Sequence, residues 1–476
     1  MRQATIDQGK LMKRARCMTR VFVFIVACLF FTSCDRFLEV DEPTSKIPAE
    51  VVFSDDVTAN SAIVGMYLDL YVRGTGFATS GNESVTSFAG LSSDELKNNK
   101  NDQAFLEFQR NAILPTEPML ERLWGSMYES VYEANAIMEG LATSVGVTES
   151  KKKQFRGEAL FVRAFCYFYL VNFFGDVPLP TSTDYKVNNN LARAPQSQVY
   201  DQVKKDLLEA EDLLPEAYQG TDRTRPNKSA AAALLARTYL YTQDWARAED
   251  KATKILARPD YALPADLNTV FLATSKEAIW QLRPSDVTGY TNEGYWFGSF
   301  NATSMNVLTD NIAASFEPDD KRLASWVTST TGGDATLFLP FKYKEARPST
   351  LPDEFSVVLR LAEMYLVRAE ARLNLDKLAL AIADLDAIRK RAGLPLIAQT
   401  NPGISKEELM LAIEQERRVE LFTEWGHRWL DLKRWNKAIP VLSPLKPDIT
   451  ESDLLYPIPT NELLKNQNLH PQNPGY

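Results

Sequence analysis

The chain has very little cysteine and histidine, with four cysteines and two histidines among 476 residues. Cys17 and Cys28 lie in the predicted N-terminal signal segment and Cys34 directly follows it, which leaves Cys166 for the rest of the chain. A disulfide framework and a thiolate zinc site both need more cysteines, so the folded part can build neither within one chain. Because Cys166 lies in an apolar run, we expect it to be a small buried hydrophobic residue.

The sequence is also poor in motifs that carry chemistry. A histidine-based relay or metal site would have to use His427 or His470, and we find neither a nucleophile elbow nor a dinucleotide fingerprint. The Gly-Gly-Asp run at 332–334 is a lone turn, and the acidic run at 317–320 lacks the regular ligand spacing of a cation loop. We therefore expect no cofactor, no metal and no enzymatic activity.

The N-terminus is typical of an export signal. Basic residues are followed by an eleven-residue apolar run at 21–31, which is too short to span a bilayer as a stable helix. Phe31-Thr32-Ser33-Cys34 then resembles a lipoprotein processing site, the alternative being a plain secretory signal. We predict a lipoprotein signal peptide at 1–33, lipidation of Cys34, a lipid-anchored tether at 34–50 and a folded domain at 51–476.

The mature chain would be acidic. Removing residues 1–33 takes away six basic residues and one acidic residue, so the formal charge changes from −9 to −14. This charge argues against nucleic-acid binding and against electrostatic adhesion to anionic lipid. The membrane contact that we predict is therefore through acyl chains.

Helical periodicity dominates the folded part. We expect helices near 55–72, 118–143, 149–174, 196–214, 228–242, 244–257, 355–374, 377–392 and 405–436. Strand patterns are rare, with short candidates at 280–282 and 338–340. Two long segments lack helical periodicity, at about 74–114 and 260–351, and such long insertions in a helical protein usually carry function.

An internal repeat indicates helical hairpins. Ala236 is followed twelve residues later by Ala248 and then by Ala252, and Ala369 is followed by Ala381 at the same offset. Small residues at these positions let two antiparallel helices approach closely, as in tetratricopeptide-like hairpins. The predicted fold is mostly α, a scaffold of such hairpins interrupted by long irregular insertions.

Several motifs in one order resemble the SusD/RagB-like outer-membrane lipoproteins. They are Gly157–Ala164 with Phe174–Leu179, Asn227-Lys228 before the 230–241 helix, Arg360–Glu370, Ile388–Gly393, Glu416–Trp435 and the ending Pro457–Tyr476. The resemblance implies a SusD-like α/α superhelix that binds a nutrient, glycan or peptide, at the cell surface. It also implies a partner, a SusC-like TonB-dependent outer-membrane transporter that receives the ligand, and a lipid-anchored position facing the cell exterior. In the family the ligand residues lie in the variable insertions, so none carries over by motif.

The insertions themselves supply the candidate ligand residues. Tyr290, Asn292, Tyr295 and Trp296 lie in one glycine-interleaved run, and sugar C–H faces stack on aromatic rings while amides orient the hydroxyls. Trp296 offers the largest ring and is our first choice as stacking platform. The alternative is that these rings form a small core of the insertion.

The first insertion offers a second polar and aromatic set. Phe77 and Asn82 are its candidates for a sugar cleft, the alternative being a solvated loop.

Charged residues between 416 and 434 invite an acid–base interpretation, but their helical spacing favours a structural ion-pair network. Two other classes of function remain open at this point. A glycoside hydrolase on a helical scaffold would need two carboxylates about 5–10 Å apart. A periplasmic tetratricopeptide-type adaptor would bind protein partners instead.

Overall fold

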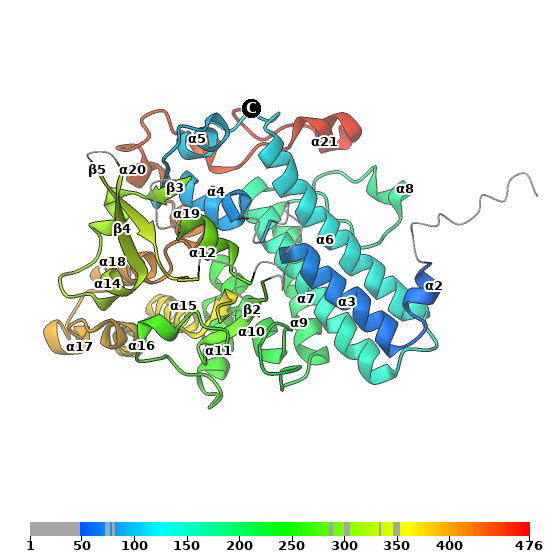
Figure 1. Cartoon of the computed structure of the whole chain (residues 1–476), viewed down its shortest axis with the longest axis horizontal. Helices are drawn as coiled ribbons and strands as arrows, with labels where there is room; N and C mark the ends of the chain where they lie inside the picture. The colour runs from blue at the N-terminus through cyan, green and yellow to red at the C-terminus, as the bar shows by residue number, and fades with distance from the viewer. Residues whose placement is uncertain are drawn as a thin grey trace, which may run out of the picture. The chain divides into compact units, whose positions relative to one another are not determined.

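Helices predominate over strands in the computed structural model, which describes residues 48–71, 77–78, 81–284, 289–298, 305–332, 335–345 and 353–476 (Figure 1). The long helices are α3 (Asp56–Tyr71), α6 (Pro118–Thr143), α7 (Glu149–Phe174), α9 (Gln196–Leu213), α10 (Lys228–Tyr241), α11 (Trp245–Leu256), α15 (Leu361–Asn374), α16 (Leu378–Ala392) and α18 (Lys406–Glu420). The mostly helical fold class that we predicted is confirmed. Cys34 and the signal segment lie outside the described residues.

Shorter elements connect and cover these helices. The short helices are α2 (Ala49–Val52), α4 (Val85–Ser92), α5 (Gln103–Arg110), α8 (Tyr185–Asn188), α12 (Asn292–Phe297), α13 (Asp310–Ala313), α14 (Lys321–Trp326), α17 (Ile397–Thr400), α19 (His427–Arg434), α20 (Ala438–Leu442) and α21 (Thr460–Lys465). The 3-10 turns are η2 (Gly81–Glu83), η3 (Leu267–Thr269), η4 (Glu451–Leu454) and η5 (Gln467–Leu469). The strands are β1 (Leu96–Asn98), β2 (Ala278–Leu282), β3 (Asn306–Leu308), β4 (Val327–Gly332), β5 (Ala335–Pro340) and β6 (Ser356–Arg360).

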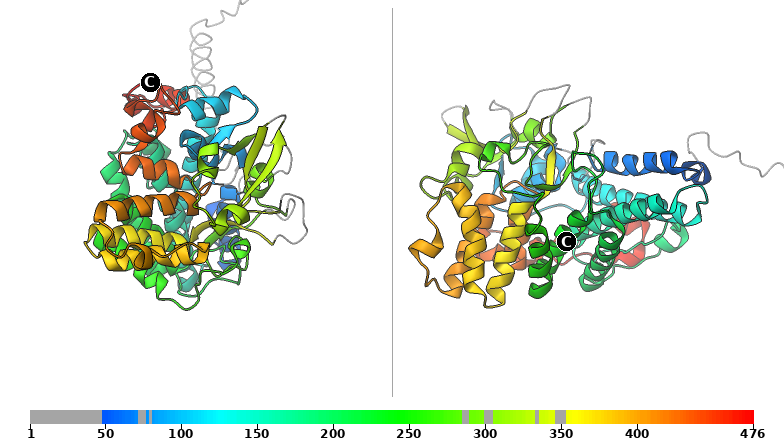
Figure 2. Two further views of the ribbon diagram at one scale, coloured as in Figure 1. Left: turned by 90° about the vertical axis from the view of Figure 1, so that its left-hand side faces the viewer. Right: turned by 90° about the horizontal axis from the view of Figure 1, so that it is seen from below.

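The long helices pack as a continuous series of hairpins within the unit Val52–Tyr476. Along the series α6 packs on α7, α7 on α9, α9 on α10, and α10 on α11. Helix α11 then packs directly against α15, although the second insertion separates them in sequence (Figure 2, right). The predicted hairpin repeat is therefore confirmed, and the insertion leaves the stack of hairpins without a spatial break.

Small side chains allow this close helix packing. Ala236, Ala248 and Ala252 are fully buried where α10 and α11 meet, as are Ala369 and Ala381 in α15 and α16. A methyl group at each position lets the helix backbones approach, and larger side chains would have to displace a neighbour.

Helix α7 is the centre of the core. It is long and apolar enough to cross a bilayer by composition, but its most apolar stretch is 94% buried inside the protein. Cys166 lies within it without solvent exposure, as predicted, and burial raises the pKa of its thiol. The apolar character of α7 is thus explained by its central position in the fold.

Two predicted helices were too long. The helix expected at 405–436 is broken after Glu420, because Thr423, Trp425 and Gly426 have positive φ angles of 50°, 49° and 74° that a right-handed helix cannot contain. The helix expected from 355 begins only at Leu361, since residues 356–360 form β6, a fully buried strand that pairs antiparallel with β2.

The first insertion contains helices that the sequence did not indicate. All eight residues of α4 are buried, so the helix has no polar face and no amphipathic period to detect. Helix α5 follows directly after β1. The expected strand pieces at 280–282 and 338–340 are confirmed as parts of β2 and β5.

A small sheet joins the two insertions into one substructure. Its strand order is β1-β3-β5-β4, and β1 of the first insertion pairs antiparallel with β3 of the second, with Leu96 opposite Leu308. The Asn98 amide donates to the Asn306 side chain at 3.2 Å, and the Asn306 amide donates to Ser87 Oγ at 2.9 Å. Segments about two hundred residues apart in sequence therefore lie side by side (Figure 1).

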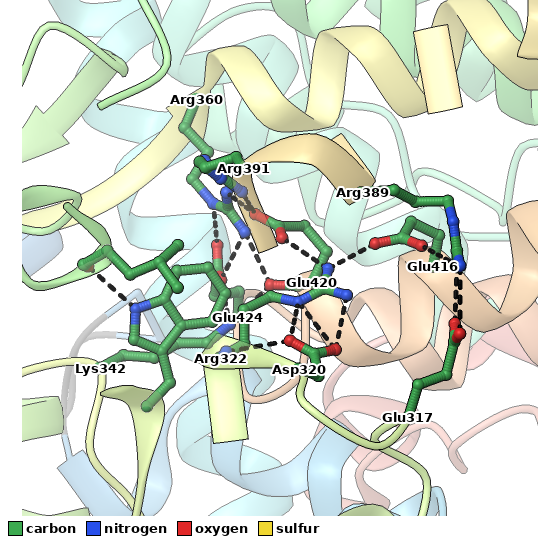
Figure 3. Close-up of polar contacts among 12 residues, drawn as sticks. Glu317, Asp320, Arg322, Lys342, Arg360, Arg389, Arg391, Glu416, Glu420 and Glu424 are labelled. Carbon is green, nitrogen blue, oxygen red and sulfur yellow. Dashed lines mark hydrogen bonds and ion pairs between the residues drawn. The ribbon is translucent and has the colours of Figure 1, made fainter. Parts of the chain in front are cut away.

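Buried ion pairs fasten the second insertion to the helical scaffold (Figure 3). Arg322, from α14 of the insertion, donates to Glu416 and Glu420 of α18 at 2.6 and 3.0 Å. Lys342, which follows β5, pairs with Glu424 and lies 4.8 Å from the ring centroid of Trp326. We call the whole cluster the charge clamp, and it consists of Asp320, Arg322, Lys342, Arg360, Arg391, Glu277, Glu416, Glu420 and Glu424.

Arg360 occupies the middle of the charge clamp, where β6 meets α15. Its guanidinium reaches Glu277 at 2.7 Å, Glu420 at 2.6 Å and Glu424 at 2.7 Å. Arg391 of α16 also pairs with Glu277 and Glu420. Burial alone would raise the pKa of Glu420, but the guanidinium groups of Arg391, Arg360 and Arg322 outweigh it and hold that pKa well below its ordinary value.

Removing Arg360 from the charge clamp should destabilise the fold strongly. Arg360→Met leaves three buried carboxylates short of a partner, and we expect it to lower the free energy of unfolding by about 3–5 kcal/mol. Urea unfolding followed by circular dichroism measures the change. Lys254→Met is the matched control: Lys254 and Asp250 form an ion pair with side chains 62% and 53% exposed, which contributes about 0.5 kcal/mol or less. Similar losses in both variants would contradict the role given to the clamp.

Candidate functional site

Three aromatic rings of the second insertion lie together at the surface, and we call them the aromatic platform: Tyr290, Tyr295 and Trp296. Tyr295 and Trp296 are 37% and 40% exposed, and Tyr290 is half-buried. Tyr290 and Tyr295 stack with ring centroids 4.8 Å apart and an interplanar angle of 14°. Trp296 stands at 88° to Tyr295, with centroids 5.1 Å apart. These three rings therefore form an exposed cluster, whereas Phe297 of the same run is 2% exposed and belongs to the core.

Helix α12 carries two of the platform rings and is tied to the scaffold at its first residue. The hydroxyl of Tyr71, in α3, accepts a hydrogen bond from the Asn292 backbone N–H at 3.2 Å and donates to the Tyr290 carbonyl at 3.3 Å. Asn292 itself is half-buried at the start of α12. One buried tyrosine thus fixes the segment from which the platform projects.

Two further features set the position of α12. Thr291 caps the helix, its hydroxyl accepting from the Gly294 N–H at 3.0 Å. Gly294 packs so tightly that a Cβ there would lie 2.4 Å from the Glu345 carbonyl oxygen, so only glycine fits without a shift. The glycines in this run allow close packing on one side while the rings remain exposed on the other.

A buried carboxyl lies beneath the platform. Glu293, the second residue of α12, is 7% exposed and accepts a hydrogen bond from Ser356 Oγ of β6 at 2.9 Å. Burial raises the pKa of Glu293 to about 7. This position differs from that of a catalytic acid in an open cleft, because the carboxyl faces the protein interior.

The two candidates from the first insertion occupy different environments. Phe77 is 1% exposed and packs against Phe165 and Tyr169 at centroid distances of 5.8 and 6.3 Å, so it presents no ring face to solvent. Asn82 lies in η2, which packs against α12. It is 7% exposed, and its Oδ1 has no hydrogen-bond partner among the described residues. Asn82 therefore adjoins the platform helix, whereas Phe77 belongs to the core.

The charged residues between 416 and 434 form structural ion pairs, as predicted. Arg417 donates to Asp431 at 2.7 Å, and Arg434 pairs with both Asp431 and Glu370. Arg418 and Arg428 both reach Asp94 of the first insertion. These contacts place the cluster in the interior, where it joins the helices to the insertions.

Sequence reasoning named Asn82 of η2 as a candidate, but it found neither Tyr71 nor the packing of η2 against α12. Tyr71 lies at the end of a scaffold helix and carries no local signal, because its role depends on a contact with a segment more than two hundred residues away. Glu83 of η2 is held by Arg122 of α6 at 2.7 Å, which fixes η2 beside α12 in the same way. Only the folded chain brings these residues together.

A hollow with aromatic lining residues lies on the scaffold, between the ends of α10, α15, α18 and α19. It has a volume of about 640 Å³ and includes Tyr241, Trp245 and Trp435. The Trp435 indole N–H, however, donates to Glu370, and the Arg434 guanidinium lies 4.6 Å from its ring centroid. Because these contacts already engage the Trp435 ring, the aromatic platform is the better candidate for stacking on a ligand.

Comparison with known families covers most of the chain. Residues 36–240 match a family model described as "Starch-binding associating with outer membrane", and residues 286–450 match the model of the SusD family. The chain belongs to the SusD/RagB family. It is 25% identical to SusD-like protein P25 of Formosa agariphila, over 94% of this chain and 96% of that protein.

Solved SusD structures share the fold. A SusD superfamily protein from Bacteroides vulgatus superposes with a TM-score of 0.75 at 23% identity, over 89% of this chain and all of that one. A laminarin-binding SusD-like protein superposes with a TM-score of 0.74 at 25% identity, over 89% of this chain and all of the other. The superhelix of hairpins with inserted substructures is therefore the SusD architecture.

The exposure of Trp296 predicts a small effect of its removal on stability. Trp296→Ala should change the free energy of unfolding by less than about 1 kcal/mol, because the ring is already partly in water. Trp280→Ala is the matched control, since Trp280 is fully buried against Phe161 and Phe165 and its loss should cost about 3–5 kcal/mol. Thermal and urea unfolding measure both variants. A loss at Trp296 as large as that at Trp280 would place Trp296 in a core.

Proposed function

We propose that the protein captures a glycan at the cell surface on the aromatic platform and delivers it to a SusC-like TonB-dependent transporter, without catalysing a reaction. The observation that carries the proposal is the exposed cluster of Tyr290, Tyr295 and Trp296. Large rings exposed to water on a fixed helix are costly to keep unless they serve recognition.

The platform has the chemistry that sugars require. Pyranose C–H faces pack on aromatic rings, and neighbouring amides can hydrogen-bond the hydroxyl groups. Asn292 begins the platform helix and Asn82 lies in the turn packed against it. The tie to Tyr71 and the close packing at Gly294 hold the rings in place before ligand arrives, which reduces the entropy lost on binding.

The relatives support a glycan as the ligand class. One matching family model carries starch binding in its description, and one structural relative binds laminarin by its name. Soluble starch and laminarin are therefore the first probes to use. The sequence resemblance also allowed a peptide as the ligand. Peptides are therefore titrated against the same purified protein for comparison with the two glycans.

Trp296 should contribute measurably to glycan affinity. A ring stacked on a sugar is worth about 1–3 kcal/mol by analogy with stacking on bases, so Trp296→Ala should weaken binding by roughly 5- to 150-fold. Isothermal titration with laminarin and with soluble starch measures the change. Tyr185→Ala is the control, because Tyr185 is an aromatic residue 66% exposed on α8, outside the platform, and should bind as the wild type does.

Two results would count against this site. Unchanged affinity in Trp296→Ala, with a wild type that binds, would move the glycan site elsewhere on the molecule. Release of new reducing ends from either glycan by the purified protein would favour a hydrolase.

Anchoring is proposed through lipid on Cys34. One diacylglycerol and one acyl chain bury enough methylene groups to hold the protein stably, at about 0.8 kcal/mol per CH₂. Cys34→Ala should therefore move the protein from the membrane fraction to the soluble fraction after salt and carbonate washing. Retention of the variant in the membrane would show that something other than acyl chains holds it.

A stable complex with the transporter is also proposed. Purification of a tagged copy in mild detergent should bring down one much larger membrane protein in near-equal amount. A carrier protein fused to residues 1–50 serves as control, since it has the anchor without the folded domain and should bring down none of it. Recovery of the lipoprotein alone in several detergents would argue for an independent binding protein.

A further inference from the structure

Glu293 differs from the buried carboxylates of the charge clamp. The charge clamp gives each of its carboxylates at least one cationic partner, as Arg360 does for Glu420 and Glu424. Among the described residues no ion pair includes Glu293, and its Oε2 has no hydrogen-bond partner there. Its Oε1 accepts a hydrogen bond from the Ser356 hydroxyl at 2.9 Å. A carboxylate in such a site is poorly compensated once it is ionised.

Among the described residues, the groups that interact with Glu293 are Tyr71 of α3, Tyr343 after β5 and Ser356 of β6, and none of them is a cation. The elements η2 and β3, which pack on α12, add Asn82, Glu83 and Asn306. The segment after β5, whose Glu345 carbonyl lies beside Gly294, adds Lys344 and Glu345, and the Lys344 ammonium donates to the carbonyls of Ser325 and Phe341. The charge of Glu83 is taken up by Arg122. Tyr71 and Tyr343 are themselves harder to ionise because of the Glu293 charge, and both pKa values are raised, first by burial and then by that charge. Within the described part of the chain, an ionised Glu293 would thus have a hydroxyl group as its hydrogen-bond partner and no cation paired with it.

We propose that Glu293 is a positioning residue for the aromatic platform, which keeps its place while this carboxyl is protonated and is displaced when it ionises. Glu293 lies three residues before Trp296 in the same single-turn helix, and α12 is only six residues long. A helix that short has few internal hydrogen bonds, so its position depends on outside contacts. Movement of Glu293 toward water would carry Tyr295 and Trp296 with it.

The pH range follows from the burial of the carboxyl. Because burial raises the pKa of Glu293 from 4.5 to about 7, the folded protein keeps a proton that the unfolded chain releases. Stability from this group is fully present below about 4.5 and is lost as the pH rises toward 7. Above about 7 the ionised form predominates, and the platform should be displaced in most molecules.

The effect on ligand capture rests on the proposed glycan function, whereas the effect on the platform does not. The first readout therefore uses no glycan. Protein labelled with 5-fluorotryptophan is titrated from about pH 5.5 to about pH 9 by fluorine NMR, and the Trp296 signal is assigned with Trp296→Phe. We expect this signal to shift with a midpoint near pH 7 in the wild type.

Two variants separate this role from a general effect of pH. Glu293→Gln keeps the shape and removes the ionisation, so its Trp296 signal should stay constant over the same range. Glu95→Gln is the matched control: Glu95 is another buried carboxyl, bonded to the Thr423 N–H, and burial raises its pKa to about 8. In the Glu95→Gln variant, the Trp296 signal should shift with pH as it does in the wild type. A flat wild-type profile, or the same shift in Glu293→Gln, would overturn the proposal.

Glycan affinity supplies the second readout. With laminarin as probe, the wild type should bind about ten-fold more weakly at about pH 8 than at about pH 6, because one unit above its pKa a group is about nine-tenths ionised. The Glu293→Gln variant should bind laminarin with the same affinity at both pH values. Absence of laminarin and starch binding at every pH would reject the proposed function, while the fluorine titration would still decide the role of Glu293. Equal pH dependence of affinity in wild type and Glu293→Gln would contradict the role directly.

Discussion

Burying guanidinium groups and carboxylates between two parts of a protein is costly unless every charge meets its partner in good geometry. In this chain that condition is met by Arg322, Arg360 and Arg391, which connect the second insertion, α16 and α18 through shared carboxylates (Figure 3). A shifted insertion would leave several of these charges unpaired. The charge clamp therefore fixes one position for the insertion, and β3 of the sheet that joins both insertions packs against α12, which carries Tyr295 and Trp296 of the platform.

Much of the scaffold could be predicted from sequence because amphipathic helices and small residues at fixed offsets leave a local pattern. The helices at 118–143 and 149–174 end where the periodicity ends. Helix α4 was missed because burial on every side removes the pattern, and β6 was missed because a buried strand and a buried helix are both continuously apolar. The break before α19 depends on positive φ angles at Thr423 and Trp425, residue types that rarely adopt them.

The candidate site was only partly predictable, for a different reason. Phe77 lies in an insertion rich in serine, glycine and asparagine, and Trp296 lies in one with several glycines and many aromatic residues. Both were predicted from sequence to contact a ligand. Contacts with α7 bury Phe77, while Tyr71 and Gly294 hold α12 so that Trp296 remains exposed. Exposure of a ring is decided by packing between distant segments, and the composition of its own segment does not contain that information.

The central claim is that the scaffold positions the insertions and that the platform in the insertion binds the ligand. Hydrogen–deuterium exchange with and without laminarin or soluble starch tests it most directly, because backbone protection maps the contact without any substitution. The account predicts slower exchange on binding in peptides covering 290–298 and 81–83, with peptides of α16 and α18 unchanged. Protection of the scaffold helices, with 290–298 exchanging as in the free protein, would contradict it.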